Sequence, residues 1–370
     1  MKRIYNYLKK DAVLTISWVL AIISMFFIKP DKAYAGYIDW RSLGILWSLM
    51  IITKGYMQNG IFEKIGHALL TRTRKMWQLI AVLVGLNFFS SMIITNDVSL
   101  ITFVPFAIMM LKQCGRQELM IPVVVLQTIA ANLGSMLTPI GNPQNLYLYG
   151  LAGTGIGEFI MWLLPYTIAS ALLLVISILL IKNKNEIICI EDTDSEAAHN
   201  TSVPRVMAYS VLFILALLVV ARVLTWYILA AAVLITVLLL EKNVLAKADY
   251  ALLLTFIGFF IFTGNMGRVE PVAHFLAGIV NGRELEVGII TSQCISNVPA
   301  ALLLSEFTDN IKNLAIGVNI GGLGTLIASM ASLISYKLYA NEVPEKKGKY
   351  FAVFTAVSYT HLRAHETRED

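Results

Sequence analysis

Residues Met76–Leu111 read MWQLIAVLVGLNFFSSMIITNDVSLITFVPFAIMML, an apolar run with a polar tip at Thr95-Asn96-Asp97 in its middle. A polar tip at membrane depth cannot face lipid, because its backbone groups would lack hydrogen-bond partners there. Each arm is also short for a full crossing, which takes about 20 apolar residues. We therefore predict a re-entrant helical hairpin over 76–111, rather than two ordinary spanning helices joined by a polar turn.

A second segment, Glu286–Phe307, has the same pattern around a polar tip at Ser296-Asn297-Val298-Pro299. Asn297, like Asn96 in the first segment, stands where the N-cap of the following helix would stand. Pro299 then falls in the first turn of that helix, where its missing N–H costs nothing. The pattern predicts a second hairpin over 286–307.

The composition excludes a soluble enzyme, a disordered chain and a secreted disulfide scaffold. The chain has 370 residues, of which 57% are apolar and only 14% are charged, and its mean hydropathy is +0.70. A soluble domain is about 25% charged. The net charge is +5. The lysines and arginines behind it cluster in the short loops between apolar runs, which is typical of membrane topology and not of nucleic-acid binding. We expect an all-α polytopic membrane protein.

Apolar runs and one polar linker organise the chain. The first membrane repeat is expected over 1–181, a cytoplasmic linker over 182–205 and a second repeat over 206–357, which opens with a linking helix at 206–221. Residues 358–370 look like a non-native tail and are left out of the predicted fold. The predicted spans are 12–28, 42–58, 121–150, 157–181, 206–221, 224–240, 250–265 and 312–337, and another begins at Tyr350.

The N-terminus is expected in the cytoplasm of a bacterial cell, with the chain in the inner membrane. Lys2, Arg3, Lys9 and Lys10 precede the first apolar run, and most other basic residues fall on the same predicted side. This run is longer than a usual signal-peptide core, so an uncleaved helix is favoured over a signal peptide.

The two halves match in their helices 121–150 and 312–337, which are both expected to break in mid-membrane. Asn-plus-small clusters recur at corresponding places, and inverted-topology repeats with broken helices are typical of secondary transporters. Close helix packing is the alternative explanation for the small residues. Aligning Ala131–Gly141 with Val318–Ala328 pairs Asn132 with Asn319, Gly134 with Gly321, and Thr138 with Thr325.

A broken helix leaves N–H groups that suit an anion and carbonyls that suit a cation. We expect sodium at the Asn96/Gly141 and Asn297/Ala328 sites, and no resident cofactor. The substrate and ion candidates of the first half are Ser90, Ser91, Thr95, Asn96, Asp97, Asn132, Thr138, Gly141 and Asn142. Those of the second half are Ser292, Ser296, Asn297, Val298, Asn319, Thr325 and Ser329.

Two ionisable residues of the apolar runs are candidates for a functional role, Asp97 and Lys54. Asp97 is the stronger candidate, as carrier of a coupling proton or neutraliser of a bound cation; the alternative is an N-cap carboxylate on the helix from Val98. Lys54 lies near a helix end, where snorkelling to the membrane surface is the favoured explanation.

At Ile94–Asp97, Ala131–Asn145 and Ser296–Pro299 the chain resembles the ion transporter superfamily, and most closely its uncharacterised citrate-transporter-like bacterial permeases. The resemblance covers about residues 12–357. It implies a homodimer, with substrate between the two tips and elevator-like movement of the hairpins. In the dicarboxylate branch each tip reads Ser-Asn-Thr. Here Asp97 would repel a carboxylate and Val298 offers no hydroxyl, so a dicarboxylate is disfavoured.

The expected function is secondary active transport of a small anion, a carboxylate or inorganic oxyanion, coupled to Na⁺ or H⁺. The alternatives are an Na⁺/H⁺ antiporter of the same fold without organic substrate, or an arsenite-type efflux permease. An enzyme is not expected, because no nucleophile–base pair or metal cluster is apparent in the sequence.

Overall fold

The computed structural model describes residues 12–70, 73–181, 186 and 202–366. The secondary-structure elements of this part of the chain are all helices. The first half contains α2 (Ala12–Phe27), α3 (Tyr34–Tyr37), α4 (Trp40–Gln58), α5 (Ile61–Leu70), α6 (Met76–Ile94), α7 (Asn96–Gln113), α8 (Met120–Ser135), α9 (Pro143–Ala152) and α10 (Ile156–Leu180). The second contains α11 (Val203–Val220), α12 (Trp226–Leu240), α13 (Tyr250–Gly267), α14 (Glu270–Val280), α15 (Glu284–Ile295), α16 (Asn297–Leu304), α17 (Ile311–Ile320), α18 (Met330–Glu342) and α19 (Lys347–Glu366). Short 3₁₀ helices lie at Gln117–Leu119, Lys242–Lys247, Ser305–Phe307 and Pro344–Lys346.

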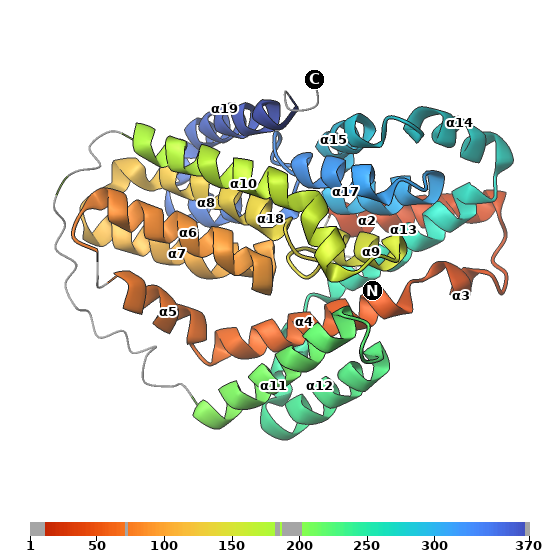
Figure 1. Cartoon of the computed structure of the whole chain (residues 1–370), viewed down its shortest axis with the longest axis horizontal. Coiled ribbons are helices and arrows are strands. Elements are labelled where there is room, and N and C mark those ends of the chain that lie inside the picture. Colours follow the sequence, from red (N-terminus) through yellow and green to blue (C-terminus); the bar gives the residue numbers. More distant parts are fainter. Residues whose placement is uncertain (1–11, 71–72, 182–185, 187–201, 367–370) are drawn as a thin grey trace.

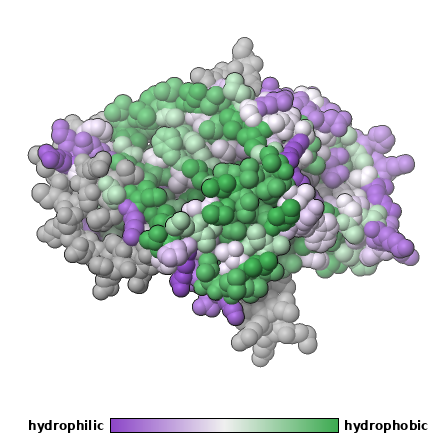
Figure 2. Space-filling model, turned by 60° about the horizontal axis from the view of Figure 1, so that its bottom comes forward, coloured by the Kyte–Doolittle hydropathy of each residue, from purple (hydrophilic) through white to green (hydrophobic). Residues whose placement is uncertain are grey.

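The protein is a multi-pass integral membrane protein. Among the described residues, five helices are long and apolar enough to cross a bilayer. They are α6, α10, α11, α13, and the span Gln117–Ser135, in which a 3₁₀ turn leads into α8. Large apolar side chains on α10 and α11 lie exposed, and Figure 2 shows a broad hydrophobic field on one face, with hydrophilic residues toward its edges. Such a surface is stable in lipid and would be costly in water.

The helices gather in three groups (Figure 1). Helices α6, α7, α8 and α10 run side by side, with α18 packed on α7 and α8. On the opposite side of the molecule α2 pairs with α13, and α15 packs against α17. Below them α4 lies against α11 and α12. Both hairpins therefore pack against the broken helix of their own half.

The predicted spans correspond to helices, and both predicted breaks occur. The run 121–150 divides into α8 and α9, and the run 312–337 divides into α17 and α18. The arms of the first hairpin are longer than expected, since α6 and α7 have 19 and 18 residues. By length α6 would suffice for a crossing, so arm length does not distinguish a re-entrant hairpin from two spans.

Two predicted segments lie at polar stretches of the chain. Most of the linker 182–205 lies outside the described residues, and α11 begins at Val203. The prediction leaves residues 358–370 out of the fold as a non-native tail; in the structure α19 continues to Glu366 and buries Ser358 and His361. The Ser358 hydroxyl accepts a hydrogen bond from the Gly324 N–H at 2.7 Å, because the break after α17 leaves that donor unpaired.

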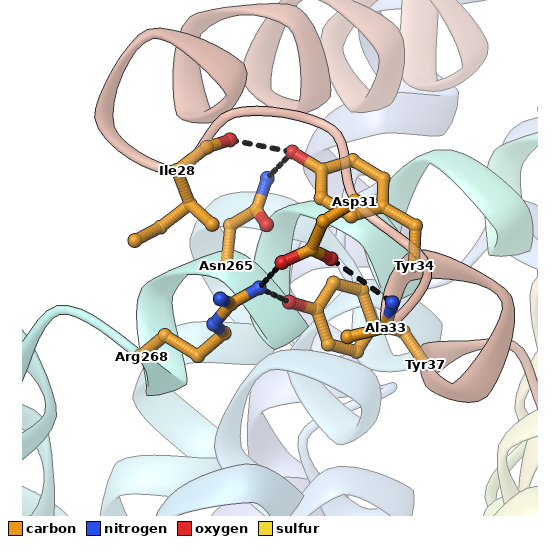
Figure 3. Close-up of polar contacts among 7 residues, drawn as sticks. All are labelled: Ile28, Asp31, Ala33, Tyr34, Tyr37, Asn265 and Arg268. Atoms are coloured by element: carbon orange, nitrogen blue, oxygen red, sulfur yellow. Dashed lines mark hydrogen bonds and ion pairs between the residues drawn. The ribbon is translucent and has the colours of Figure 1, made fainter.

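The loop after α2 is tied to the end of α13 (Figure 3). Arg268 Nη1 donates to Asp31 Oδ2 and to the Tyr37 hydroxyl, both at 2.8 Å. Asn265 Nδ2 donates to the Tyr34 hydroxyl, also at 2.8 Å. These contacts hold α2 and α13 together at one end of the helix pair.

Candidate functional site: two hairpin tips against two broken helices

The first hairpin turns at Thr95, which separates α6 from α7. Thr95 has φ 72° and ψ 149°, a conformation that residues other than glycine rarely adopt. The next residue, Asn96, is only 4% exposed, and its backbone N–H donates to the Gly141 carbonyl at 3.1 Å. The tip is therefore bonded directly to the break between α8 and α9.

The second hairpin has the same geometry at Ser296, between α15 and α16. Ser296 has φ 76° and ψ 152°, and the following Asn297 is 4% exposed. The Asn297 N–H donates to the Ala328 carbonyl at 2.9 Å, in the break between α17 and α18. The structure thus joins the two residue pairs at which the sequence predicted sodium.

The first break is organised by Asn145 and Asn142. Asn142 caps α9, with its side chain accepting from the Asn145 N–H at 2.9 Å and Pro143 in the first turn. Asn145 Nδ2 donates to the carbonyls of Met136 and Thr138, which lost their helical partners at the end of α8. Asn145 stood inside the quoted motif but was missing from the predicted site.

The second break is organised by Gln293, which sequence reasoning missed. Its Nε2 donates to the Gly321 and Leu323 carbonyls at 2.7 and 2.6 Å, and its Oε1 accepts from the Thr325 N–H at 2.9 Å. The signal that could have identified Gln293 is its position, a polar side chain one turn before the hairpin tip. Gly324, with φ 103°, provides the tight turn.

Thr138 and Thr325, which the alignment of the two halves pairs, occupy matching positions. Thr138 Oγ1 donates to the Met92 carbonyl at 2.5 Å, and Thr325 Oγ1 donates to the Gln293 carbonyl at 3.3 Å. Each hydroxyl therefore joins its break to the last turn of the preceding hairpin arm.

Asn132 on α8 connects the first half to the second. Its Oδ1 accepts hydrogen bonds from Asn96 Nδ2 at 3.2 Å and from the Ser329 hydroxyl at 2.8 Å. Its Nδ2 donates to the Ser332 hydroxyl at 3.2 Å. The buried side-chain amide of Asn132, in the first broken helix, thus finds hydrogen-bond partners at the start of α18.

Asn319 on α17 makes the reciprocal connection. Its Oδ1 accepts from Asn142 Nδ2 at 3.0 Å, and its Nδ2 donates to Asn145 Oδ1 at 2.6 Å. The alignment that pairs Asn132 with Asn319 also pairs Asn142 with Ser329, and Asn145 with Ser332. Each half therefore contributes the same positions to the other half, and this exchange of equivalent contacts is the central feature of the site.

Four predicted residues make local or apolar contacts. The Ser91 hydroxyl donates to its own helix at Phe88 O, and the Ser292 hydroxyl donates to Gly288 O. Val298 is 6% exposed and belongs to the apolar core. Ser90 lies outside the tip and its hydroxyl is 2.7 Å from that of Ser99.

Asp97 lies half-buried in the first turn of α7. Its N–H donates to Asn96 Oδ1 at 3.0 Å, while its carboxylate makes no hydrogen bond or close ion pair within the described residues. Its charged neighbours are Asp249 and Lys54. The carboxylate is thus available to a proton or a cation.

An apolar cleft of about 770 Å³ separates the first hairpin from α11. Successive turns of α6 form one wall and the first turns of α11 form the other, with α5 and Tyr56 of α4 between them. Beside the second hairpin α16 packs on α13, and a more polar pocket of about 510 Å³ lies between α14 and residues 305–309. The two tips therefore meet the remaining helices differently.

The profile of the citrate transporter family matches residues 7–331. The chain belongs to this family. An uncharacterised transporter of Methanocaldococcus jannaschii is 32% identical over 94% of both chains. Inner membrane protein YbiR of Escherichia coli is 29% identical over 86% of both chains. Silicon efflux transporter LSI3 of Oryza sativa subsp. japonica is 31% identical over 38% of this chain and 29% of its own.

Membership of the citrate transporter family agrees with the resemblance found at the tips and breaks. It also places the protein among membrane transporters and permeases. The family match ends at residue 331, shortly after the Ser329 contact, so it includes both tips and both breaks.

Proposed function

We propose that the protein is a secondary active transporter that moves a small anion together with Na⁺ or H⁺. The exchange of Asn132 and Asn319 contacts between the two broken helices carries this proposal. Broken helices at a repeat interface bring helix-end carbonyls and N–H groups together at one place, as secondary transporters require. The substrate site would lie between the tips at Asn96 and Asn297.

The matching tips favour an inverted-topology repeat, with the first hairpin entering from the cytoplasm and the second from outside. In this arrangement the hairpins and broken helices move as one body past α4, α11 and α13, in an elevator-like cycle. The apolar cleft between α6 and α11 supports such relative movement, because it leaves room beside the first hairpin.

The oxygen atoms around each tip suit Na⁺, which takes hard, neutral oxygen ligands as other hard cations do. In the first half they would be the Asn96 side chain, the Thr138 hydroxyl and the Gly141 carbonyl. In the second half they would be the Asn297 side chain, the Thr325 hydroxyl and the Ala328 carbonyl. Asp97 would offset the charge of a cation at the first site, or carry the proton in its place.

The substrate class is an inorganic oxyanion or a carboxylate, and the Asp97 charge favours an oxyanion or a weakly charged species over a dicarboxylate. Two relatives are named as a silicon efflux transporter and a putative transporter arsB, which supports arsenite-type efflux as a second candidate. The third is an Na⁺/H⁺ antiporter of the same fold, for which Asp97 would be the exchanging carboxylate.

Uptake into proteoliposomes separates these candidates. A panel of citrate, other carboxylates, phosphate, sulfate, arsenite and silicic acid is offered under imposed Na⁺ or H⁺ gradients, with Asp97→Asn as the matched variant. We expect gradient-dependent flux of one anion class and loss of its cation dependence in the variant. Sodium-driven proton release without any anion would select the antiporter, and no flux under any gradient would refute transport.

We further propose a homodimer in the bacterial inner membrane with a cytoplasmic N-terminus. The E. coli relative is named as an inner membrane protein, and the basic residues before α2 favour that orientation. Mass measurement of the detergent-solubilised protein tests the dimer.

A further inference from the structure

Lys54 is an unusual residue in α4, because its ammonium group lies half-buried on an otherwise apolar helix. Its hydrogen-bond contact within the described residues is the Met57 thioether, 3.8 Å from Nζ. An ammonium donates three hydrogen bonds and a thioether is a weak acceptor. A half-buried ammonium group with such a weak hydrogen-bond partner needs a compensating charge.

The tip of the first hairpin rests on the same part of α4. Met57, beside Lys54, packs on the apolar cluster that contains Ile94 and Val98, the residues flanking the tip. Asp97 directly precedes Val98. The packing therefore places the segment that contains Asp97 against the segment of α4 that contains Lys54.

The charges around this boundary are few. Lys54 interacts electrostatically with Asp249, Asp97 and Lys247, and Asp97 interacts with Asp249 and Lys54. Asp249 is exposed and already engaged, since it caps α13 by accepting from the Leu252 N–H at 3.1 Å. Lys247 is exposed to solvent. Within the part of the chain that the structure describes, Asp97 is thus the half-buried carboxylate near Lys54, and its oxygens accept no hydrogen bond there.

We propose that Lys54 is the counter-ion of Asp97, and that this pair neutralises the tip of the first hairpin when no coupling cation is bound. The proposal rests on the proposed transport function for its coupling cation, but not for the pair itself. Opposite charges interact more strongly in a low-dielectric environment than in water, and either charge alone at membrane depth is costly. A cation that approaches Asp97 must therefore compete with Lys54.

A double-mutant cycle tests the pair without any transport measurement. Lys54→Met, Asp97→Asn and the double variant of the full chain are purified in detergent, and their melting temperatures are compared. We expect Lys54→Met to lower the melting temperature by at least about 2 °C in the wild-type background and by less in the Asp97→Asn background, because the partner is already gone. Additive changes in melting temperature would overturn the proposal that Lys54 and Asp97 form a pair. Lys247→Met is the matched control, and its effect should be independent of Asp97.

A second experiment exchanges the two charges and tests the pair even if a single variant does not fold. The swapped protein, Lys54→Asp with Asp97→Lys, should regain monodisperse protein that Lys54→Asp alone loses, whereas a purely structural lysine would not be rescued. Recovery no better than that of Lys54→Asp alone would contradict the proposal.

Sodium titration then links the pair to coupling. The NaCl concentration for half-maximal thermal stabilisation should fall at least about threefold in Lys54→Met, since a competing positive charge is removed, and should stay unchanged in Lys54→Arg. Equal concentrations in all three proteins would exclude competition. Absence of any sodium effect in the wild type would instead count against sodium coupling, while the thermal cycle still decides the pair.

Discussion

At the scale of single residues, two glycines allow the broken helices to lie against the hairpin backbones. A Cβ at Gly134 would stand 2.1 Å from the Phe88 carbonyl oxygen, and one at Gly321 would stand 2.8 Å from the Ile289 Cα. These distances are far inside van der Waals contact, and the neighbouring atoms are backbone. Glycine is therefore required by close approach at both places, in matching positions of the two halves.

Gly134→Ala should destabilise the protein by about 1–3 kcal/mol, because the hairpin backbone has to move away from α8. Thermal or denaturant unfolding in detergent measures the change. Gly85→Ala is the matched control on α6, where a Cβ meets nothing within 4 Å; there the helix propensity of alanine should make the effect neutral or slightly favourable. Equal destabilisation by both variants would contradict the packing argument.

The Asp31–Arg268 pair gives a pH dependence at the surface. The hydrogen bond from Arg268 holds the pKa of the Asp31 carboxyl below its ordinary value of 3.8. A lowered folded-state pKa means that the pair stabilises the fold at pH values above the ordinary value and stops doing so as pH falls through the lowered one.

Asp31→Asn should therefore melt at a lower temperature than the wild type at neutral pH, and the difference should vanish as the pH falls through the lowered pKa of Asp31. Melting curves across that pH range measure it. Asp309→Asn, which alters another exposed loop carboxylate, should show no such pH-dependent difference. A wild-type advantage that persists in acid would show that the ion pair is not its origin.

At the scale of elements, an apolar cleft between α6 and α11 lies beside the first hairpin. Because its walls are mostly apolar, a sliding hairpin meets little polar resistance there. Short helices precede both hairpins, α5 before the first and α14 before the second, and both are amphipathic enough to lie along a membrane surface. These helices connect each hairpin to the helix before it.

Gly85→Trp should fill the cleft and arrest the movement. Gly85 lines the cleft and has open space where a side chain would grow, so folding is expected to survive. Transport should fall at least about tenfold, the effect of 1.4 kcal/mol on the barrier of the moving step. Proteoliposome uptake and the melting temperature are measured together. Gly157→Trp, at an open position on α10, is the control, and normal uptake by Gly85→Trp would argue against movement through this cleft.

At the scale of the whole molecule, the halves are related by exchanged contacts rather than by strong sequence similarity. Asn132 of the first half meets Ser329 of the second, and Asn319 of the second meets Asn142 of the first. Both exchanges occur among side chains that are at most 4% exposed. Contacts of this reciprocal kind arise when two similar units face each other about a two-fold axis, as in an isologous interface.

An inverted relation places the bases of the two hairpins on opposite sides of the membrane. In a protein whose three cysteines, Cys114, Cys189 and Cys294, are replaced by serine, single cysteines are introduced at Gln113 and Asp309, two exposed positions. An impermeant maleimide should label the Asp309→Cys protein in intact cells and the Gln113→Cys protein only in inside-out vesicles. Labelling of both from one side would exclude inverted repeats.

The sequence by itself determined the class of protein, the two tips and the two breaks. Hydropathy, prolines and asparagines act locally, so Asn96, Asn297 and the run around Pro143 were recognisable without a structure. Only the tertiary structure decided what those elements touch: Gln293 across the second break, Ser332 beside Asn132, and Ser358 beneath Gly324. These contacts join positions far apart in the chain, and a buried polar group is satisfied by whichever partner the packing brings to it.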